Sequence, residues 1–225
     1  MLNKIGKGRP SSYSIRKDNI IRIAASLFVK TGFAKTTMRE IAKACGINVG
    51  TLYYYFKSKD DILYLIIHNA VTRPEGWREH FENSCDRYGA TQALKEFIKM
   101  YYSSTDETQD ICLFTYQETR NLDKTSQRII LTAAEADVDV CAAILKKGIE
   151  SGEFNIDNVT ILSHDIIAIG HMWAVRRWYL QPRINLDQYI QEHTNLFLTK
   201  IKPVSPSNKN TVEKKHGKQN RVPVP

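Results

Sequence analysis

The sequence has no apolar run of the roughly 18–20 residues that a bilayer-spanning helix needs. Its basic amino end has no apolar stretch behind it and does not resemble a secretory signal peptide. The four cysteines are widely spaced and form no CxxC pair, so neither a zinc site nor a disulfide framework is expected. From these absences we expect a cytoplasmic protein with reduced thiols, without a metal and without a bound cofactor.

Basic residues gather at both ends of the 225-residue chain, whose formal net charge is +8. Residues 1–59 contain 12 Lys or Arg and 2 Asp or Glu, and residues 203–225 contain 5 and 1. The segment between them contains 15 basic and 21 acidic residues. A basic end on an acidic body is expected of a protein that binds a polyanion, with nucleic acid ahead of a membrane surface.

Helical spacing of apolar residues dominates, and neither strand alternation nor an internal repeat is visible. Near the amino end, a helix is predicted from Asp18 to the Thr-Gly pair at 31–32. Thr37 and Glu40 fit a capping box for a second helix, and Asn48 is placed to cap a third. A serine and an aspartate three residues apart begin a fourth helix, which ends by Pro74 at the latest.

The second and third helices, joined by a tight glycine-containing turn, form a helix-turn-helix, whose second helix reads the major groove of DNA. The spacing places Leu52, Tyr53 and Phe56 of that helix on the packed side and directs Tyr54 and Tyr55 outward. Tyrosine offers DNA both an apolar face and a hydroxyl group. The residues predicted to contact DNA are Thr37, Arg39, Asn48, Gly50, Thr51, Tyr53, Tyr54, Tyr55 and Lys59.

Some of these assignments have alternatives. Tyr54 or Tyr55 could instead be partly buried against the body of the protein, and Lys59 could be a solvated lysine rather than a phosphate contact. Arg9, in the Gly-Arg-Pro sequence near the amino end, could enter a minor groove or belong to a nonspecific basic tail.

The sequence predicts an all-α fold with four segments. Residues 1–15 are expected to be a flexible basic arm and residues 16–62 a helix-turn-helix DNA-binding domain. Residues 63–202 are expected to form a larger helical domain and residues 203–225 a disordered basic tail. Helices of the larger domain are predicted at about 77–86, 90–103, 107–121, 124–151, 157–181 and 186–201.

The stretch "TGFAKTTMREIAKACGINVGTLYYYFKSKDDIL", residues 31–63, closely resembles the DNA-binding signature of TetR-family transcriptional regulators. Tyr55 stands where many members of that family carry histidine. The resemblance implies an all-α homodimer whose larger domain, residues 63–202, binds a small-molecule effector and dimerises. It further implies a repressor that the effector releases from double-stranded operator DNA, and that residues 146–154 connect the long central helix to the dimerisation helices.

The last two predicted helices, Val159–Leu180 and Leu186–Leu198, are the best candidates for the dimer interface. A two-fold dimer presents its reading helices about one helical turn of DNA apart, so the operator is expected to be an approximate palindrome.

An arginine pair inside the apolar segment "HMWAVRRWYL" suggests an effector site. A buried guanidinium requires an anion or an exit to solvent. One hypothesis is an acidic or phosphorylated effector in a pocket made by Tyr102, Phe114, Tyr116, Trp173, Arg176 and Arg177. The segment resembles regulators that sense acyl-coenzyme A thioesters. The alternative, a salt bridge across the dimer, has the greater weight.

Three other functions are alternatives to a ligand-responsive regulator. His164 and His171, seven residues apart, could ligate a metal, but core or interface histidines are the more common use of such a pair. An enzyme would require Cys112 or Cys141 with His164 as a nucleophile pair, yet no motif surrounds these cysteines. A nonspecific architectural DNA-binding protein would share the salt dependence but lack a palindromic footprint and release by a small molecule.

Overall fold

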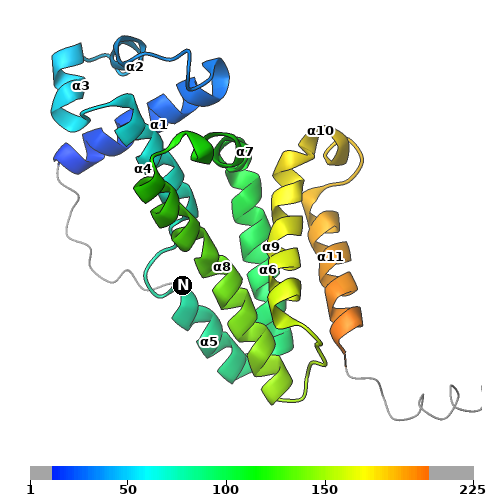
Figure 1. Ribbon diagram of the computed structural model, residues 1–225. Coiled ribbons are helices and arrows are strands. Elements are labelled where there is room, and N and C mark those ends of the chain that lie inside the picture. The colour runs from blue at the N-terminus through cyan, green and yellow to red at the C-terminus, as the bar shows by residue number, and fades with distance from the viewer. Residues whose placement is uncertain (1–11, 203–225) are drawn as a thin grey trace, which may run out of the picture.

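A computed structural model describes residues 12–202, and these form helices and connecting turns without a strand (Figure 1). In chain order the helices are α1 (Ser12–Thr31), α2 (Met38–Ala44), α3 (Val49–Tyr55), α4 (Lys59–Val71), α5 (Trp77–Tyr88), α6 (Ala90–Glu107), α7 (Gln109–Glu118), a 3-10 turn (Thr119–Asn121), α8 (Lys124–Glu150), α9 (Val159–Val175), α10 (Arg177–Leu180) and α11 (Leu186–Ile201). The all-α prediction is confirmed. None of these helices is long and apolar enough to cross a membrane.

Helices α1–α3 and the start of α4 form a head at one end of the molecule, and the remaining helices form an elongated body (Figure 1). The predicted tail, residues 203–225, and the part of the predicted arm that contains Arg9 lie outside the described residues.

The predicted caps of the head helices are confirmed. The Thr37 amide donates to Oε2 of Glu40 over 2.7 Å, and the Glu40 amide donates back to the threonine hydroxyl. Oδ1 of Asn48 accepts from the Thr51 amide over 2.7 Å at the start of α3. Ser58 and the aspartate at 61 make a second capping box before α4, which ends at Val71. Each cap satisfies amide groups that have no partner within the helix, so these short helices have fixed ends.

The first helix begins earlier than predicted, at Ser12 rather than Asp18, so the proposed flexible arm is wrong for residues 12–15. Its added turns contact α3. The Tyr13 ring stacks on Tyr55 with 4.8 Å between ring centres and meets Tyr54 edge-on at 5.9 Å. The helix start therefore depends on contacts between elements, which local cap signals do not contain.

The head core does not stop at the predicted boundary between residues 62 and 63. That boundary lies inside α4, and Ile62, Leu63 and Ile66 of this helix are buried in the head core. Phe114 of α7 and Ile130 of α8 are buried in the same cluster. The body therefore completes the core of the head.

The body is built around α6, α8 and α9, with α5 and α11 packed against them (Figure 1). At Gly170 of α9, an added Cβ would lie 2.8 Å from the Tyr102 ring, so glycine permits the close approach of α6 and α9. The predicted helix 157–181 is wrong as one element, because α9 ends at Val175 and the chain turns at Arg176 before the short α10.

Candidate DNA-binding surface and effector cavity

Helix α3 lies at the outer end of the head (Figure 1). Two of its aromatic side chains are exposed to solvent. Tyr54 is 73% exposed and Tyr53 is 51% exposed, whereas Tyr55 is half-buried beside Leu52 and Phe56. The predicted orientations, with Tyr53 on the packed side and Tyr55 directed outward, are therefore wrong. Tyr55 follows Leu52 by three residues and so shares its face of the helix, while Tyr53 is displaced by about 100°.

The remaining predicted DNA contacts occupy different places on the head. Arg39 is exposed on α2, next to the cap residue Thr37, which is also exposed. The side chain of Asn48 caps α3 by accepting a hydrogen bond from the Thr51 amide, and Thr51 is half-buried in the first turn of that helix. At Gly50 a Cβ would meet only Asn48 Oδ1 at 3.3 Å, so the backbone here lies open to a close approach.

Lys59 makes an interaction within the head that the sequence did not reveal. Its Nζ donates to the carbonyl oxygen of Phe33 over 2.8 Å and lies 4.2 Å from the centre of the Phe33 ring. The lysine thereby ties the start of α4 to the turn between α1 and α2. An ammonium has three donors, so two remain for another acceptor.

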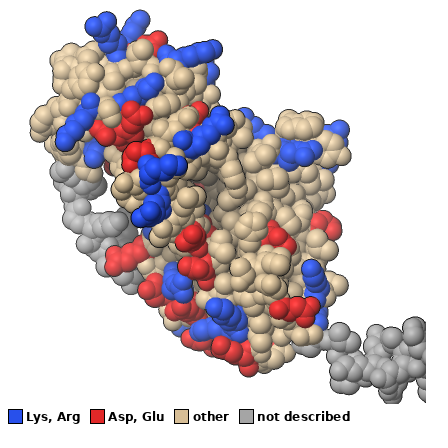
Figure 2. Space-filling view, viewed as in Figure 1, with Lys and Arg blue, Asp and Glu red and all other residues tan. Residues whose placement is uncertain are grey.

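On the face of the molecule seen in Figure 2, charge is distributed as the sequence predicted. Figure 2 shows Lys and Arg side chains spread over the head, whereas Asp and Glu are more numerous on the lower part of the body. A cationic surface attracts a phosphate backbone and releases its counterions on binding, and the resulting affinity falls with added salt.

A cavity of about 440 Å³ lies in the body where α4, α6, α7, α8 and α9 meet. Its lining combines aliphatic side chains with hydroxyl groups and a small number of charged or aromatic polar groups. The lining residues are Ala70, Val71, Arg73, Tyr101, Ser104, Thr105, Thr108, Cys112, Thr115, Tyr116, Thr119, Ile130, Leu131, Ala134, Asp137 and His171. Its size lies in the usual range of small-molecule sites.

An ion pair between half-buried Arg73 and buried Asp137 closes one side of the cavity. Nε and Nη2 of Arg73 donate to the carboxylate of Asp137 through three hydrogen bonds of 2.6–2.9 Å. Asp137 is only 4% exposed. Burial opposes the charge of Arg73, but the hydrogen bonds and the charge of Asp137 outweigh it and raise the pKa of the guanidinium. Removing one partner of such a pair leaves an uncompensated buried charge.

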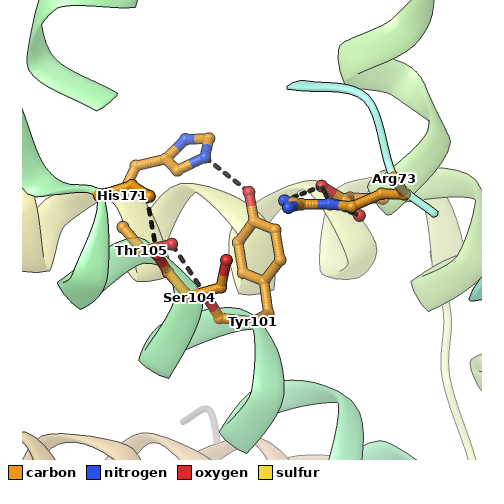
Figure 3. A network of polar contacts seen from close by, with 7 residues as sticks. Arg73, Tyr101, Ser104, Thr105 and His171 are labelled. Atoms are coloured by element: carbon orange, nitrogen blue, oxygen red, sulfur yellow. Dashed lines mark hydrogen bonds and ion pairs between the residues drawn. The ribbon is translucent and has the colours of Figure 1, made fainter. Parts of the chain in front are cut away.

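His171 joins two tyrosines across the cavity. Its Nε2 lies 2.6 Å from the Tyr101 hydroxyl, and its Nδ1 lies 2.7 Å from the hydroxyl of Tyr116. Figure 3 shows the imidazole directed at the Tyr101 hydroxyl, with the Arg73 guanidinium on the other side of that ring. Burial lowers the pKa of His171 to about 4, so the imidazole is neutral at neutral pH.

Of the six residues predicted to line an effector pocket, only Tyr116 lines this cavity. Tyr102 is buried in the body core, and Phe114 is buried in the head core. Trp173 is also in the body core and donates from Nε1 to Asp106 over 2.6 Å. The prediction that these three residues line the effector pocket is therefore wrong. Apolar spacing identifies buried side chains, but it does not distinguish a solid core from the wall of a cavity.

The two arginines also lie away from the cavity. Arg177 pairs with Asp110 of α7 in the same subunit, which differs from both the predicted effector contact and the predicted bridge across a dimer. Arg176 is exposed, with its guanidinium carbon 5.3 Å from the centre of the Trp178 ring. Each guanidinium thus finds an acidic or aromatic partner at the surface.

Neither Arg73 nor Asp137 was predicted from the sequence as a site residue, and His171 was expected in a core or interface. Asp137 did carry a signal, because it is seven residues after Ile130 and four before Cys141 on the buried face of α8. An aspartate at such a position requires a cation. Nothing in the sequence identifies Arg73 as that partner.

The cysteine and histidine residues give no support to a catalytic or metal site. Burial raises the pKa of Cys112 to about 11 and also raises the pKa of Cys141, which keeps both thiols protonated. His164 is exposed, and its nearest ionic partner is Asp165 at 3.7 Å. Within residues 12–202, no group of three or more metal-ligating side chains is present.

Two of the relatives found among known proteins match most of the chain. It is 26% identical over 192 residues to the HTH-type transcriptional regulator HbdR of Aromatoleum sp. (strain CIB), covering 81% of this chain and 79% of that protein. It is 25% identical over 191 residues to the HTH-type transcriptional repressor KstR2 of Rhodococcus jostii (strain RHA1), covering 84% and 92%.

Solved structures share the fold. A bacterial regulatory protein of the tetR family from Rhodococcus RHA1 superposes with a TM-score of 0.71 at 20% identity, over 87% of this chain and all of that one. The structure of AibR in complex with isovaleryl coenzyme A and operator DNA superposes with a TM-score of 0.66 at 17% identity, over 80% and 97%.

Two family models account for the head and most of the body. The model described as "Bacterial regulatory proteins, tetR family" matches residues 20–64, which span the helix-turn-helix and the start of α4. The model described as "Tetracyclin repressor-like, C-terminal domain" matches residues 88–201, which is half of the chain and includes most of the cavity lining. The chain belongs to the TetR family of bacterial transcriptional regulators.

Proposed function

We propose that this protein represses transcription by binding a palindromic operator as a homodimer, and that a small molecule in the body cavity releases it. The observation that carries the proposal is the shared set of helices: α4, α7 and α8 line the cavity and also contribute side chains to the core of the DNA-binding head. As part of the same proposal, the protein acts in the cytoplasm, where its operator lies, and has no enzymatic activity.

The exposed side of α3 is proposed to enter the major groove. Tyr54 and Tyr53 are the most exposed side chains of its outer surface, and Gly50 lets the backbone approach the duplex. Thr51 is proposed to contact a phosphate or a thymine methyl group, and Arg39 a phosphate or a guanine edge.

Four further residues are proposed to support the structure of the head, to contact DNA, or to do both. Thr37 and Asn48 fix the ends of α2 and α3 and lie at the surface near the duplex. Lys59 is proposed to contact a phosphate with the donors that Phe33 leaves unused. Tyr55 is proposed to act mainly through its stack with Tyr13, which supports the outer face of α3.

The dimer is proposed to form through α9 and α11, the last two long helices. Both carry large apolar side chains at the surface of this subunit, among them Ile161 and Met172 of α9 and Leu196 of α11. Pairing these faces in a second copy would remove the side chains from water and set the spacing of the two heads.

The effector is proposed to act through α4 and α7. Ala70 and Val71 at the end of α4 line the cavity, and residues earlier in the same helix are buried in the head. On α7, Tyr116 lines the cavity, while Phe114 stacks on Phe28 of α1 with 6.0 Å between ring centres. A ligand that displaces either helix therefore shifts the head.

An acyl-coenzyme A thioester is a proposed effector, on the basis of similar proteins and of the cavity lining rather than of the two arginines. Arg176 and Arg177, which suggested an anionic ligand, lie outside the cavity. Support comes from AibR, whose structure contains isovaleryl coenzyme A, and from the fatty acid metabolism regulator protein of Bacillus subtilis, 26% identical over 135 residues. An acyl group is apolar enough for the lining of aliphatic and hydroxyl side chains.

Selection of bound duplexes from a random DNA pool tests the proposal. An enriched inverted repeat, with half-sites about one helical turn apart, supports operator recognition by a dimer. Tyr54→Ala or Thr51→Ala should change the selected bases, whereas Tyr88→Ala, on the body, should not. A pool without an enriched repeat would favour nonspecific architectural binding. Repeating the selection with acyl-coenzyme A thioesters tests release.

A further inference from the structure

The cavity contains one cation and one anion, and they neutralise each other. Among its lining residues only Arg73 and Asp137 carry a formal charge at neutral pH, since His171 is neutral there. Two nitrogens of the guanidinium hold the carboxylate through three hydrogen bonds. A ligand that brings its own charge into this space would therefore meet no unpaired ion of opposite sign.

The burial of Tyr101 sets the order of protons in the hydrogen-bonded series Tyr101–His171–Tyr116. Tyr101 is only 3% exposed, and within residues 12–202 its hydroxyl has no hydrogen-bond acceptor other than His171. A buried hydroxyl proton without an acceptor is costly, and the Arg73 guanidinium beside the Tyr101 ring offers only donors. The Tyr101 proton is therefore directed to Nε2 of His171, 2.6 Å away.

The remaining proton positions, on His171 and Tyr116, follow from the chemistry of imidazole. A neutral histidine that accepts at Nε2 carries its ring proton on Nδ1, which then donates to the Tyr116 oxygen over 2.7 Å. The Tyr116 hydroxyl accepts this bond and keeps its own proton. Within residues 12–202, the Tyr116 hydroxyl makes no hydrogen bond other than the one to His171. Tyr116 lines the cavity and is 58% exposed to solvent.

We infer that the effector carries an uncharged, mainly apolar group into the cavity, with an oxygen that accepts a hydrogen bond from Tyr116, and that the cavity discriminates against free carboxylates. The inference rests on the proposed function and defines the ligand class of the same site. Ketones, esters, alcohols and the acyl part of a thioester share this chemistry.

A free carboxylate is disfavoured by Asp137. This residue is buried, and a second negative charge in the cavity would have to compete with it for Arg73 or lie close to it without a counterion. Like charges that share a site are unfavourable, and loss of one partner of a buried ion pair is costly. The phosphates of an acyl-coenzyme A would accordingly have to remain outside the cavity.

Calorimetric titration of the DNA-free protein at pH 7.5 tests the inference with decan-2-one, decanoate and decanoyl-coenzyme A. Decan-2-one should bind at least about tenfold more tightly than decanoate. Tyr116→Phe should weaken decan-2-one binding by roughly 2- to 10-fold, the usual effect of one neutral hydrogen bond. Tyr88→Phe is the matched control and should have no effect. Decanoyl-coenzyme A distinguishes a thioester source of the group from a free neutral molecule.

Asp137→Asn provides the reverse test, because the amide has the shape of the carboxylate but leaves the charge of Arg73 uncompensated. This variant should prefer decanoate, whereas Asp139→Asn, at an exposed position on the same helix, should keep the original preference. Circular dichroism checks folding, and if Asp137→Asn does not fold, the Tyr116→Phe comparison decides.

Three results would overturn the inference: equal or tighter binding of decanoate by the native protein, no binding of decan-2-one or of decanoyl-coenzyme A, or an unchanged affinity for decan-2-one in Tyr116→Phe. Because DNA is absent from these titrations, such a result leaves operator binding and release untouched. Conversely, a failure of operator selection would not alter the ligand preference measured here.

Discussion

Replacing Lys59 by alanine should loosen the head, because the ammonium joins α4 to the turn before α2. The variant loses a charged hydrogen bond to the Phe33 carbonyl at 2.8 Å and a cation–ring contact at 4.2 Å. A hydrogen bond from a charged group contributes about 1.5–3 kcal/mol, and an exposed cation–ring contact about 0.5–1 kcal/mol. Since Lys59 is only half-buried, we expect a loss near the lower end, about 2 kcal/mol.

Hydrogen exchange measures this effect in the head alone. A loss of about 2 kcal/mol should speed exchange of the amides between Met38 and Tyr55 roughly 30-fold, while exchange in α8 stays unchanged. Lys57→Ala, at an exposed position two residues away, is the control and should leave exchange unaltered. Unchanged exchange in Lys59→Ala would refute the stabilising role assigned to the contact with Phe33.

The Lys59→Ala variant also separates the structural role of Lys59 from its proposed contact with DNA. If the free donors of Lys59 bind a phosphate, the slope of log affinity against log salt concentration should fall by about 0.9. A loss of stability with an unchanged slope would leave Lys59 as a structural residue and remove it from the proposed DNA surface.

Other variants probe the caps, the body packing and the cavity. Asn48→Ala should destabilise α3 by about 1 kcal/mol through loss of its cap, measured by exchange of the α3 amides. Gly148→Ala should lower the calorimetric melting temperature, because its Cβ would lie 1.9 Å from the buried Phe154 ring and this crowding, about 1–3 kcal/mol or more, outweighs a helix-propensity gain of about 1 kcal/mol. Burial lowers the pKa of His171 to about 4, so the unfolded chain binds a proton that the folded protein does not, and stability should fall by roughly 3 kcal/mol as the pH drops from 6.5 to 4. His171→Gln should flatten that dependence in urea unfolding measured across the same pH range.

The head was largely predictable because its signals are local in sequence. Thr37 with Glu40, and Asn48 with the amide of residue 51, form their bonds within one turn of helix, so the residue types alone identify the caps. Leu52 and Phe56 likewise define the buried side of α3. Judged from these two residues alone, Tyr55 falls on the buried side, because it follows Leu52 by three residues.

The features that were missed depend on contacts between distant segments. Tyr13 extends α1 because its ring meets Tyr55, 42 positions later, and no local cap records this. Arg73 and Asp137 are 64 positions apart, and their pairing creates the polar wall of the cavity. A spacing pattern shows that Asp137 faces inward, but it cannot identify which cation reaches it.

Operator binding as proposed requires that the exposed side of α3 lie against DNA. Tyr54, 73% exposed, can be replaced by the photoreactive residue p-benzoylphenylalanine, with Tyr88, 63% exposed on α5, replaced in a control protein. On irradiation with a duplex obtained by selection, the protein labelled at position 54 should crosslink to bases of each half-site, and the protein labelled at 88 should not. Equal or absent crosslinking at the two positions, with binding retained, would contradict the claim.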